Sequence, residues 1–140
     1  MNATAAALQV EATSHREASH RETSLSLVER EGALDWVRIC PLDQLPMERG
    51  VAALVNGHQV ALFRLHDGTV AAVGNRDPFS GANVMSRGLV GSRGDVPVVF
   101  SPMYKQAFSL LDGACLTEPA AGLGHFTVRL SDGWVELGLG

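Results

Sequence analysis

Residues 51–68 read VAALVNGHQVALFRLHDG, and this stretch decides the fold class of the chain. Two runs of β-branched and aliphatic residues are separated by Asn56-Gly57, and the second run ends at Asp67-Gly68. Asn-Gly and Asp-Gly adopt the positive backbone dihedrals of tight hairpin turns, so that the runs on either side of them pair in antiparallel fashion. The stretch therefore predicts a β-hairpin that continues into a third strand.

The same pattern extends toward the C-terminus, where Asp112-Gly113 and Asp132-Gly133 provide two more such turns. Apolar and polar residues alternate over residues 126–130, and no helical period longer than one or two turns follows residue 34. We predict an all-β fold, a small sandwich or barrel of antiparallel hairpins with about seven to nine short strands. The predicted strands are residues 36–39, 51–55, 59–65, 69–73, 96–100, 106–111, 125–130 and 133–139.

Residues 1–33 differ in composition from the remainder, because they are rich in Ala, Ser, Thr, Glu and Arg and contain no aromatic residue. A segment of this kind buries too little apolar surface to offset the entropy of ordering it. We predict a flexible N-terminal tail over residues 1–33 and one β domain over residues 34–140.

Composition excludes several classes of protein. The chain has 140 residues and two cysteines, which are too few for a disulfide framework or a four-thiolate metal site. Its formal net charge is −4, whereas a nucleic-acid-binding surface is basic. No long apolar run indicates a membrane span or a secretion signal. We expect a cytoplasmic protein that binds neither nucleic acid nor membrane.

A glycine-rich polar stretch, residues 74–95, interrupts the series of predicted strands. A connection this long without evident structure is uncommon in a compact domain and is usually functional or disordered. The stretch contains NRDPFSG at residues 75–81, and a second loop reads SPMYKQAF at residues 101–108. These two loops are where we look for chemistry.

The two loops resemble the ligand loops of Rieske iron–sulfur domains, which read Cys-x-His-x-Gly and Cys-Pro-x-His. In that family two thiolates bind one iron of a [2Fe–2S] cluster and two imidazoles bind the other. The loop-shaping residues of the pattern are retained here, but every ligand position is substituted. Asp77 and Ser101 stand in place of the cysteines, and Phe79 and Tyr104 stand in place of the histidines.

These substitutions predict a Rieske-like domain without a cluster. Phenylalanine has no lone pair, a serine hydroxyl is a poor iron donor near neutral pH, and Asp77 and Tyr104 offer only hard oxygen ligands. We expect Phe79 and Tyr104 to pack across the gap that the cluster leaves. The tyrosine hydroxyl would then bond to Asp77 or to a loop amide.

A Rieske-like domain that lacks all four ligands resembles the small subunits of assimilatory NAD(P)H-dependent nitrite reductase. The resemblance covers residues 34–140. It implies a non-catalytic subunit, with no cofactor and no catalytic centre in this chain. The implied partner is a large subunit that carries FAD, siroheme and a [4Fe–4S] cluster and reduces nitrite to ammonium in nitrate assimilation.

Four basic residues, Arg76, Arg87, Arg93 and Lys105, lie in or beside the two loops. Such charges can orient a partner that carries carboxylates and speed its approach, so these residues are the predicted docking residues. Two alternative functions stay open. One is a Rieske-type [2Fe–2S] ferredoxin that carries electrons, and the other is a free-standing β-barrel binding module for a small ligand or peptide.

Overall fold

The computed structural model describes residues 8–10, 34–118 and 120–139. Most of the predicted tail at residues 1–33 lies outside the described residues. Three of its residues form strand β1 (Leu8–Val10), which pairs in parallel with β3 (Gly50–Val55).

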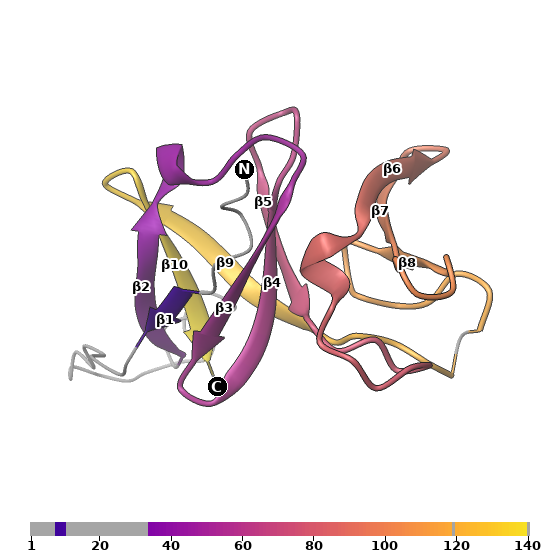
Figure 1. Ribbon diagram of the computed structural model, residues 1–140. Helices are drawn as coiled ribbons and strands as arrows, with labels where there is room; N and C mark the ends of the chain where they lie inside the picture. Colours follow the sequence, from indigo (N-terminus) through magenta and orange to yellow (C-terminus); the bar gives the residue numbers. More distant parts are fainter. Residues whose placement is uncertain (1–7, 11–33, 119, 140) are drawn as a thin grey trace, which may run out of the picture.

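The larger of two sheets has seven strands in the order β1-β3-β4-β5-β9-β10-β2 and curves into a half-barrel (Figure 1). Except for the β1–β3 pair, all of its neighbouring strands are antiparallel. The all-β prediction is therefore confirmed. The remaining strands of this sheet are β2 (Asp35–Pro41), β4 (His58–Arg64), β5 (Val70–Gly74), β9 (His125–Ser131) and β10 (Trp134–Leu139).

Two of the predicted hairpin turns fix the register of this sheet. Asn56 and Gly57, between β3 and β4, have φ angles of 48° and 85°. Asp132 and Gly133, between β9 and β10, have φ angles of 54° and 79°. Positive φ at both central residues is the signature of a type I′ turn, whose twist matches that of the paired strands. The connection from β4 to β5 is longer than two residues.

A smaller antiparallel sheet has the order β6-β7-β8. Strand β6 (Leu89–Arg93) lies inside the stretch that we interpreted as an irregular connection, and that interpretation is wrong for its second half. Gly91 and Ser92 interrupt the apolar pattern there and conceal the strand. The other strands are β7 (Val96–Phe100) and β8 (Ala107–Ser109), and two 3-10 turns are η2 (Leu42–Gln44) and η3 (Met85–Arg87).

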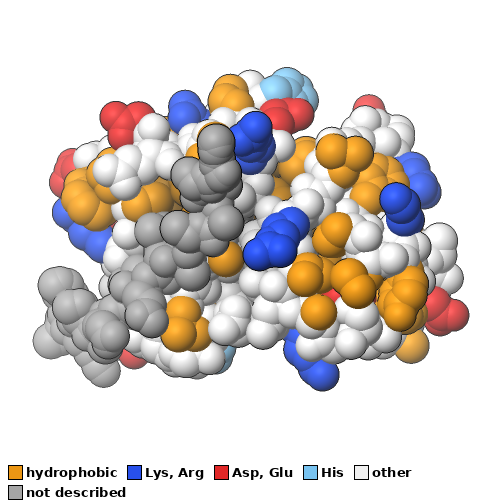
Figure 2. Space-filling model, in the orientation of Figure 1, with side chains coloured by type: hydrophobic (Ala, Val, Ile, Leu, Met, Phe, Trp, Pro, Cys, Tyr) orange, Lys and Arg blue, Asp and Glu red, His pale blue; other side chains and the backbone are white. Residues whose placement is uncertain are grey.

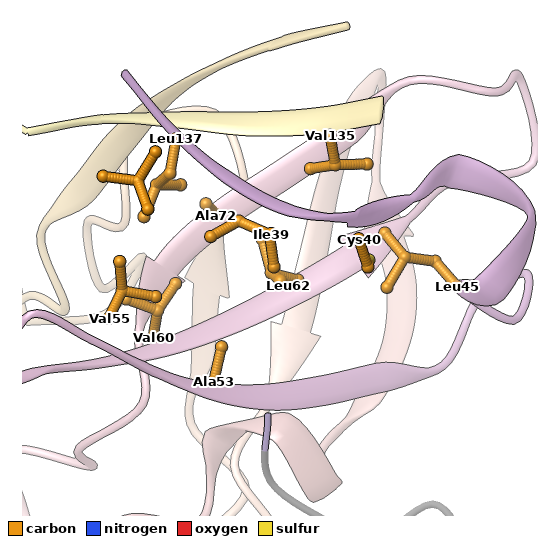
Figure 3. Close-up of a cluster of buried hydrophobic side chains, with 11 residues drawn as sticks. Ile39, Cys40, Leu45, Ala53, Val55, Val60, Leu62, Ala72, Val135 and Leu137 are labelled. Carbon is orange, nitrogen blue, oxygen red and sulfur yellow. The ribbon is translucent and has the colours of Figure 1, made fainter. Parts of the chain in front are cut away.

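Residues 60–63 of strand β4 are buried on both faces and join two hydrophobic cores. Val60 and Leu62 point into the core of the larger sheet, which Figure 3 shows with residues from β2, β3 and β10 around them. Ala61 and Phe63 point the other way, into a second core that contains Met85 and residues of the smaller sheet. The second core therefore attaches the smaller sheet and its loops to the half-barrel.

A buried carboxylate ties the last strands of the larger sheet together. Glu136 on β10 lies opposite Arg38 on β2 and Arg129 on β9, and it accepts hydrogen bonds from their Nε atoms at 3.0 and 2.7 Å. Burial alone would raise the pKa of Glu136. The hydrogen bonds and positive charges of Arg129 and Arg38 outweigh burial and hold this pKa below its ordinary value.

Candidate functional site at the two loops

The first loop follows β5 and is closed by its own backbone. The Asp77 N–H donates to the Ala82 carbonyl at 2.8 Å, and the Gly81 N–H donates to the Asp77 carbonyl at 2.7 Å. Gly81 has a φ of 81°, a left-handed conformation that glycine adopts without steric cost. These bonds form a tight turn with Asp77 at its base and Phe79 within it.

The second loop connects β7 to β8 and is closed in the same way. The Ser101 N–H donates to the Gln106 carbonyl and the Lys105 N–H donates to the Ser101 carbonyl, both at 2.9 Å. Lys105 has a φ of 65°, which is uncommon for a residue with a side chain. Ser101 thus takes the basal position that Asp77 takes in the first loop.

A hydrogen bond joins the two basal residues, and we call it the Asp77–Ser101 link. The Ser101 hydroxyl donates to Oδ2 of Asp77 at 2.6 Å, and both residues are buried, with exposed fractions of 1% and 0%. The length lies in the range of a hydroxyl that donates to a carboxylate, about 2.5–2.7 Å. Asp77 and Ser101, which stand at the positions of the two cysteine ligands, are therefore hydrogen-bonded to each other.

Two backbone amides complete this network. The Phe79 N–H donates to Oδ1 of Asp77 at 2.8 Å, and the Met103 N–H donates to the Ser101 hydroxyl oxygen at 3.1 Å. Both carboxylate oxygens of Asp77 are thereby engaged, as a buried carboxylate requires. The network fixes the backbone at two residues whose apolar side chains lie at the surface.

The histidine-replacing residues behave differently from each other. Phe79 is 37% exposed, and its ring lies 6.2 Å from the ring of Phe108, centroid to centroid. Tyr104 is 58% exposed, so the predictions that it packs across the gap and bonds to buried Asp77 are wrong, whereas a bond of its hydroxyl to a loop amide stays a prediction. The physical reason is that Ser101 and the Phe79 amide already occupy the Asp77 carboxylate.

The loops form an apolar end of the molecule that the sequence patterns did not predict. Met103 is 47% exposed and lies beside Tyr104 in the chain. Figure 2 shows hydrophobic side chains gathered, with lysine and arginine among them, over the part of the molecule that carries the smaller sheet. We call Phe79, Met103 and Tyr104 the apolar tip. An exposed Met in a loop has no sequence signal that separates it from a buried one.

The four predicted docking residues fall into two pairs. Arg76 and Lys105 are exposed and lie on the first and second loops. Arg87 ends η3 and Arg93 ends β6, so this second pair brackets β6. The structure therefore places only the first pair on the same loops as the apolar tip.

The residues at the four ligand positions do not fit a Rieske cluster, because they supply neither thiolate nor imidazole. Cys40 and Cys115 are buried free thiols that belong to different cores. Burial, with a smaller contribution from Asp43, raises the pKa of the Cys40 thiol. Among the residues that the structure describes, no group of three or more His, Cys, Asp or Glu side chains is placed to hold a metal ion.

In the same described ranges, no helix is long and apolar enough to cross a membrane.

Comparison with known proteins identifies the domain. Residues 35–138 match the Rieske-like [2Fe-2S] domain family. The chain is 42% identical over 103 residues to a nitrite reductase (NADH) small subunit of Salmonella typhimurium, which covers 73% of this chain and 95% of that protein. The solution structure of the Escherichia coli protein NirD superposes with a TM-score of 0.69 at 40% identity, covering 75% of this chain and 96% of that one.

Two further similarities were found. A nitrite reductase [NAD(P)H] large subunit of Klebsiella oxytoca is 41% identical over 103 residues, which are 74% of this chain and 11% of that protein. The ferredoxin of a carbazole 1,9a-dioxygenase from Nocardioides aromaticivorans has a TM-score of 0.66 at 21% identity and covers 75% of this chain and 98% of that one. The second similarity concerns the fold alone.

Proposed function

Because the chain belongs to the Rieske-like domain family and is a small subunit of NAD(P)H nitrite reductase, we propose that it docks on the large subunit without carrying a cluster of its own. A small subunit implies partnership with a large one. The Klebsiella oxytoca similarity supports this pairing, since there a segment that is 41% identical to this chain lies within a large subunit. Similar domains occur as a separate small subunit and as a segment of a large subunit, and both arrangements indicate that this domain associates with the large subunit.

The observation that carries the proposal is the Asp77–Ser101 link. In a Rieske domain the cluster itself bridges the two loops, whereas here a buried hydrogen bond of 2.6 Å bridges them. A buried hydrogen bond to a charged group contributes about 1.5–3 kcal/mol. The link thus supports the proposal that the two loops keep their shape without a cluster and that the chain does not carry electrons.

The proposed docking surface is the apolar tip together with Arg76 and Lys105. Aromatic residues and methionine are enriched at the centres of protein interfaces, where they exclude water. The two basic side chains would pair with carboxylates of the large subunit and set its orientation. Because the link fixes the backbone at Phe79 and Met103, little conformational entropy is lost when these residues dock.

The chemistry of the complex belongs to the large subunit in this proposal. That subunit would hold FAD, siroheme and a [4Fe–4S] cluster and reduce nitrite to ammonium. The chain would contribute no catalytic group and would position or stabilise its partner. A cytoplasmic location, without nucleic acid or membrane as a partner, is part of the proposal and agrees with the net charge of −4.

The test is a binding measurement between the purified full chain and the large subunit of the same organism. We expect a stable complex, and the double variant Arg76→Glu with Lys105→Glu should bind at least about tenfold more weakly at low salt. The control is Gln44→Glu, which adds negative charge on exposed η2 and should leave binding unchanged. Failure of the unaltered chain to bind would overturn the proposed function.

A further inference from the structure

Strand β6 is an open edge of the smaller sheet. Within the described part of the chain it pairs with β7 on one side, and no strand pairs with its other side. Figure 1 shows β6 and β7 projecting away from the half-barrel. An unpaired edge presents a row of backbone donors and acceptors to which another extended chain can bond.

The register identifies which backbone groups of β6 face outward. The two-residue turn Gly94-Asp95 makes Arg93 and Val96 the hydrogen-bonded pair that closes the hairpin. Bonded and non-bonded pairs then alternate, so Ser92 opposite Pro97 is a non-bonded pair. Pro97 agrees with this assignment, since it has no N–H and its carbonyl accepts from the Leu110 N–H on the far side at 2.8 Å.

By the same alternation Val90 also belongs to a non-bonded pair. Val90 and Ser92 therefore direct their N–H and C=O groups to the open edge, which offers two donors and two acceptors. Proteins usually protect such edges with lysine, proline or a bulge. Strand β6 contains neither lysine nor proline, and its pairing with β7 has no register shift.

An apolar shelf lies beside this edge, on the face of the sheet that carries Leu89, Gly91 and Arg93. Leu89 is 72% exposed. Gly91 has no side chain, and the Phe100 ring fills its place, since a Cβ there would lie 3.0 Å from that ring. The Arg93 guanidinium lies 5.6 Å from the centroid of the same ring. A strand that added to β6 would cover Leu89 and part of this shelf.

The charges at the two ends of β6 indicate what kind of segment fits. Arg87 precedes the strand and Arg93 ends it, and both are exposed. We propose that β6 accepts an extended segment of the large subunit as a fourth strand, with apolar residues over Leu89 and acidic residues near Arg87 and Arg93. The proposed function supplies only the identity of the partner, and this edge is distinct from the apolar tip.

Ser92→Pro is the most direct test, because it removes an outward N–H without removing a bond to β7. Proline is tolerated on edge strands where the N–H faces solvent. Against Ser92→Ala, which keeps the N–H, we expect about tenfold weaker binding of the large subunit by the full chain and an unchanged melting temperature. Arg87→Glu with Arg93→Glu should also weaken binding, most strongly at low salt.

The outcomes separate this inference from the proposed function. If the unaltered chain binds and both the proline and the charge variants bind equally well, the β6 proposal is wrong while docking stands. If the unaltered chain does not bind at all, the proposed function fails first. Loss of self-association in Ser92→Pro, measured by analytical ultracentrifugation with large-subunit binding intact, would assign the edge to a second copy and overturn the proposal.

Discussion

The half-barrel and the two-loop end of this molecule are held together by different forces. Leu62 and Leu137, in the half-barrel, are fully buried in an apolar core (Figure 3). At the two-loop end, Asp77 and Ser101 are the buried pair, whereas Met103 and Tyr104 lie about half exposed. At the two-loop end a buried polar pair thus lies beside exposed apolar side chains, whereas Leu62 and Leu137 of the half-barrel lie inside its core.

The difference teaches how a short loop pair can present apolar side chains to a partner. A loop cannot both bury its apolar residues for stability and expose them for binding. The Asp77–Ser101 link supplies order without using apolar burial, so that Phe79 and Met103 remain at the surface. The second core, beneath the loops, anchors this arrangement to β4.

The largest effect should come from the half-barrel core. Leu62→Ala removes a fully buried side chain and should lower the free energy of unfolding by about 2–5 kcal/mol, because the cavity collapses only partly. Urea denaturation measures this change. The matched control, Leu130→Ala, removes a side chain that is 48% exposed and should change stability by less than about 1 kcal/mol. Equal losses of unfolding free energy in the two variants would contradict the conclusion that the buried apolar core stabilises the half-barrel.

A smaller effect should come from the link. Ser101→Ala leaves Oδ2 of buried Asp77 without its donor and should cost about 1–3 kcal/mol of unfolding free energy. It should also weaken binding of the large subunit, since the two loops are then no longer joined. Urea denaturation and titration calorimetry measure the two losses. The exposed-site variant Ser92→Ala serves as the control, and equal stability of the two variants would refute the role given to the link.

The pH dependence of stability should separate the two regions further. The folded pKa of Glu136 is lowered, so the ion pairs with Arg38 and Arg129 stabilise the half-barrel above the unfolded pKa, about 4.3. This stabilisation should be lost as the pH falls through the folded pKa. Urea denaturation at a series of pH values from neutral downward should show a steeper decline for the unaltered chain than for Glu136→Gln. The same pH dependence of the unfolding free energy in the two proteins would contradict the stabilising role given to the Glu136 ion pairs.

The smallest effect on stability should come from the apolar tip. Tyr104→Ala removes an exposed ring and should change the free energy of unfolding by less than about 0.5 kcal/mol. Binding should nevertheless weaken by about tenfold or more, because exposed aromatic residues at interface centres contribute strongly. Thermal denaturation and titration calorimetry test the two halves of this prediction. Unchanged affinity would remove Tyr104 from the docking surface.

Local chemistry explains which parts of the fold could be predicted from sequence. Asn56-Gly57 and Asp132-Gly133 specify their turns through backbone preferences that need no tertiary context. Strand β6 was not predicted because Gly91 interrupts its apolar pattern. The glycine is needed there because the ring of Phe100, which pairs with Leu89 from the neighbouring strand β7, fills the space of a side chain. A glycine that interrupts a strand pattern is ambiguous until its neighbour on the next strand is known.

The two loops were predicted from sequence, but the contacts between them were not. Asp77, Phe79, Ser101 and Tyr104 all lie on the two loops, as expected. The Tyr104 hydroxyl was predicted to bond to Asp77 or to a loop amide. The observed partners of Asp77 are Ser101, which lies 24 residues away in the chain, and the Phe79 amide. Competition among several donors for one carboxylate is decided by backbone geometry, which sequence does not supply.

The most direct test of the account is an iron and spectroscopic measurement on the full chain. The protein would be purified without oxygen, incubated with ferrous iron and sulfide under reducing conditions, and desalted. The Asp77–Ser101 link predicts no stoichiometric iron, no visible absorption of a [2Fe–2S] cluster, and no paramagnetic signal after reduction. Two iron atoms per chain with a Rieske-type paramagnetic signal would contradict the claim that a hydrogen bond has taken the place of the cluster.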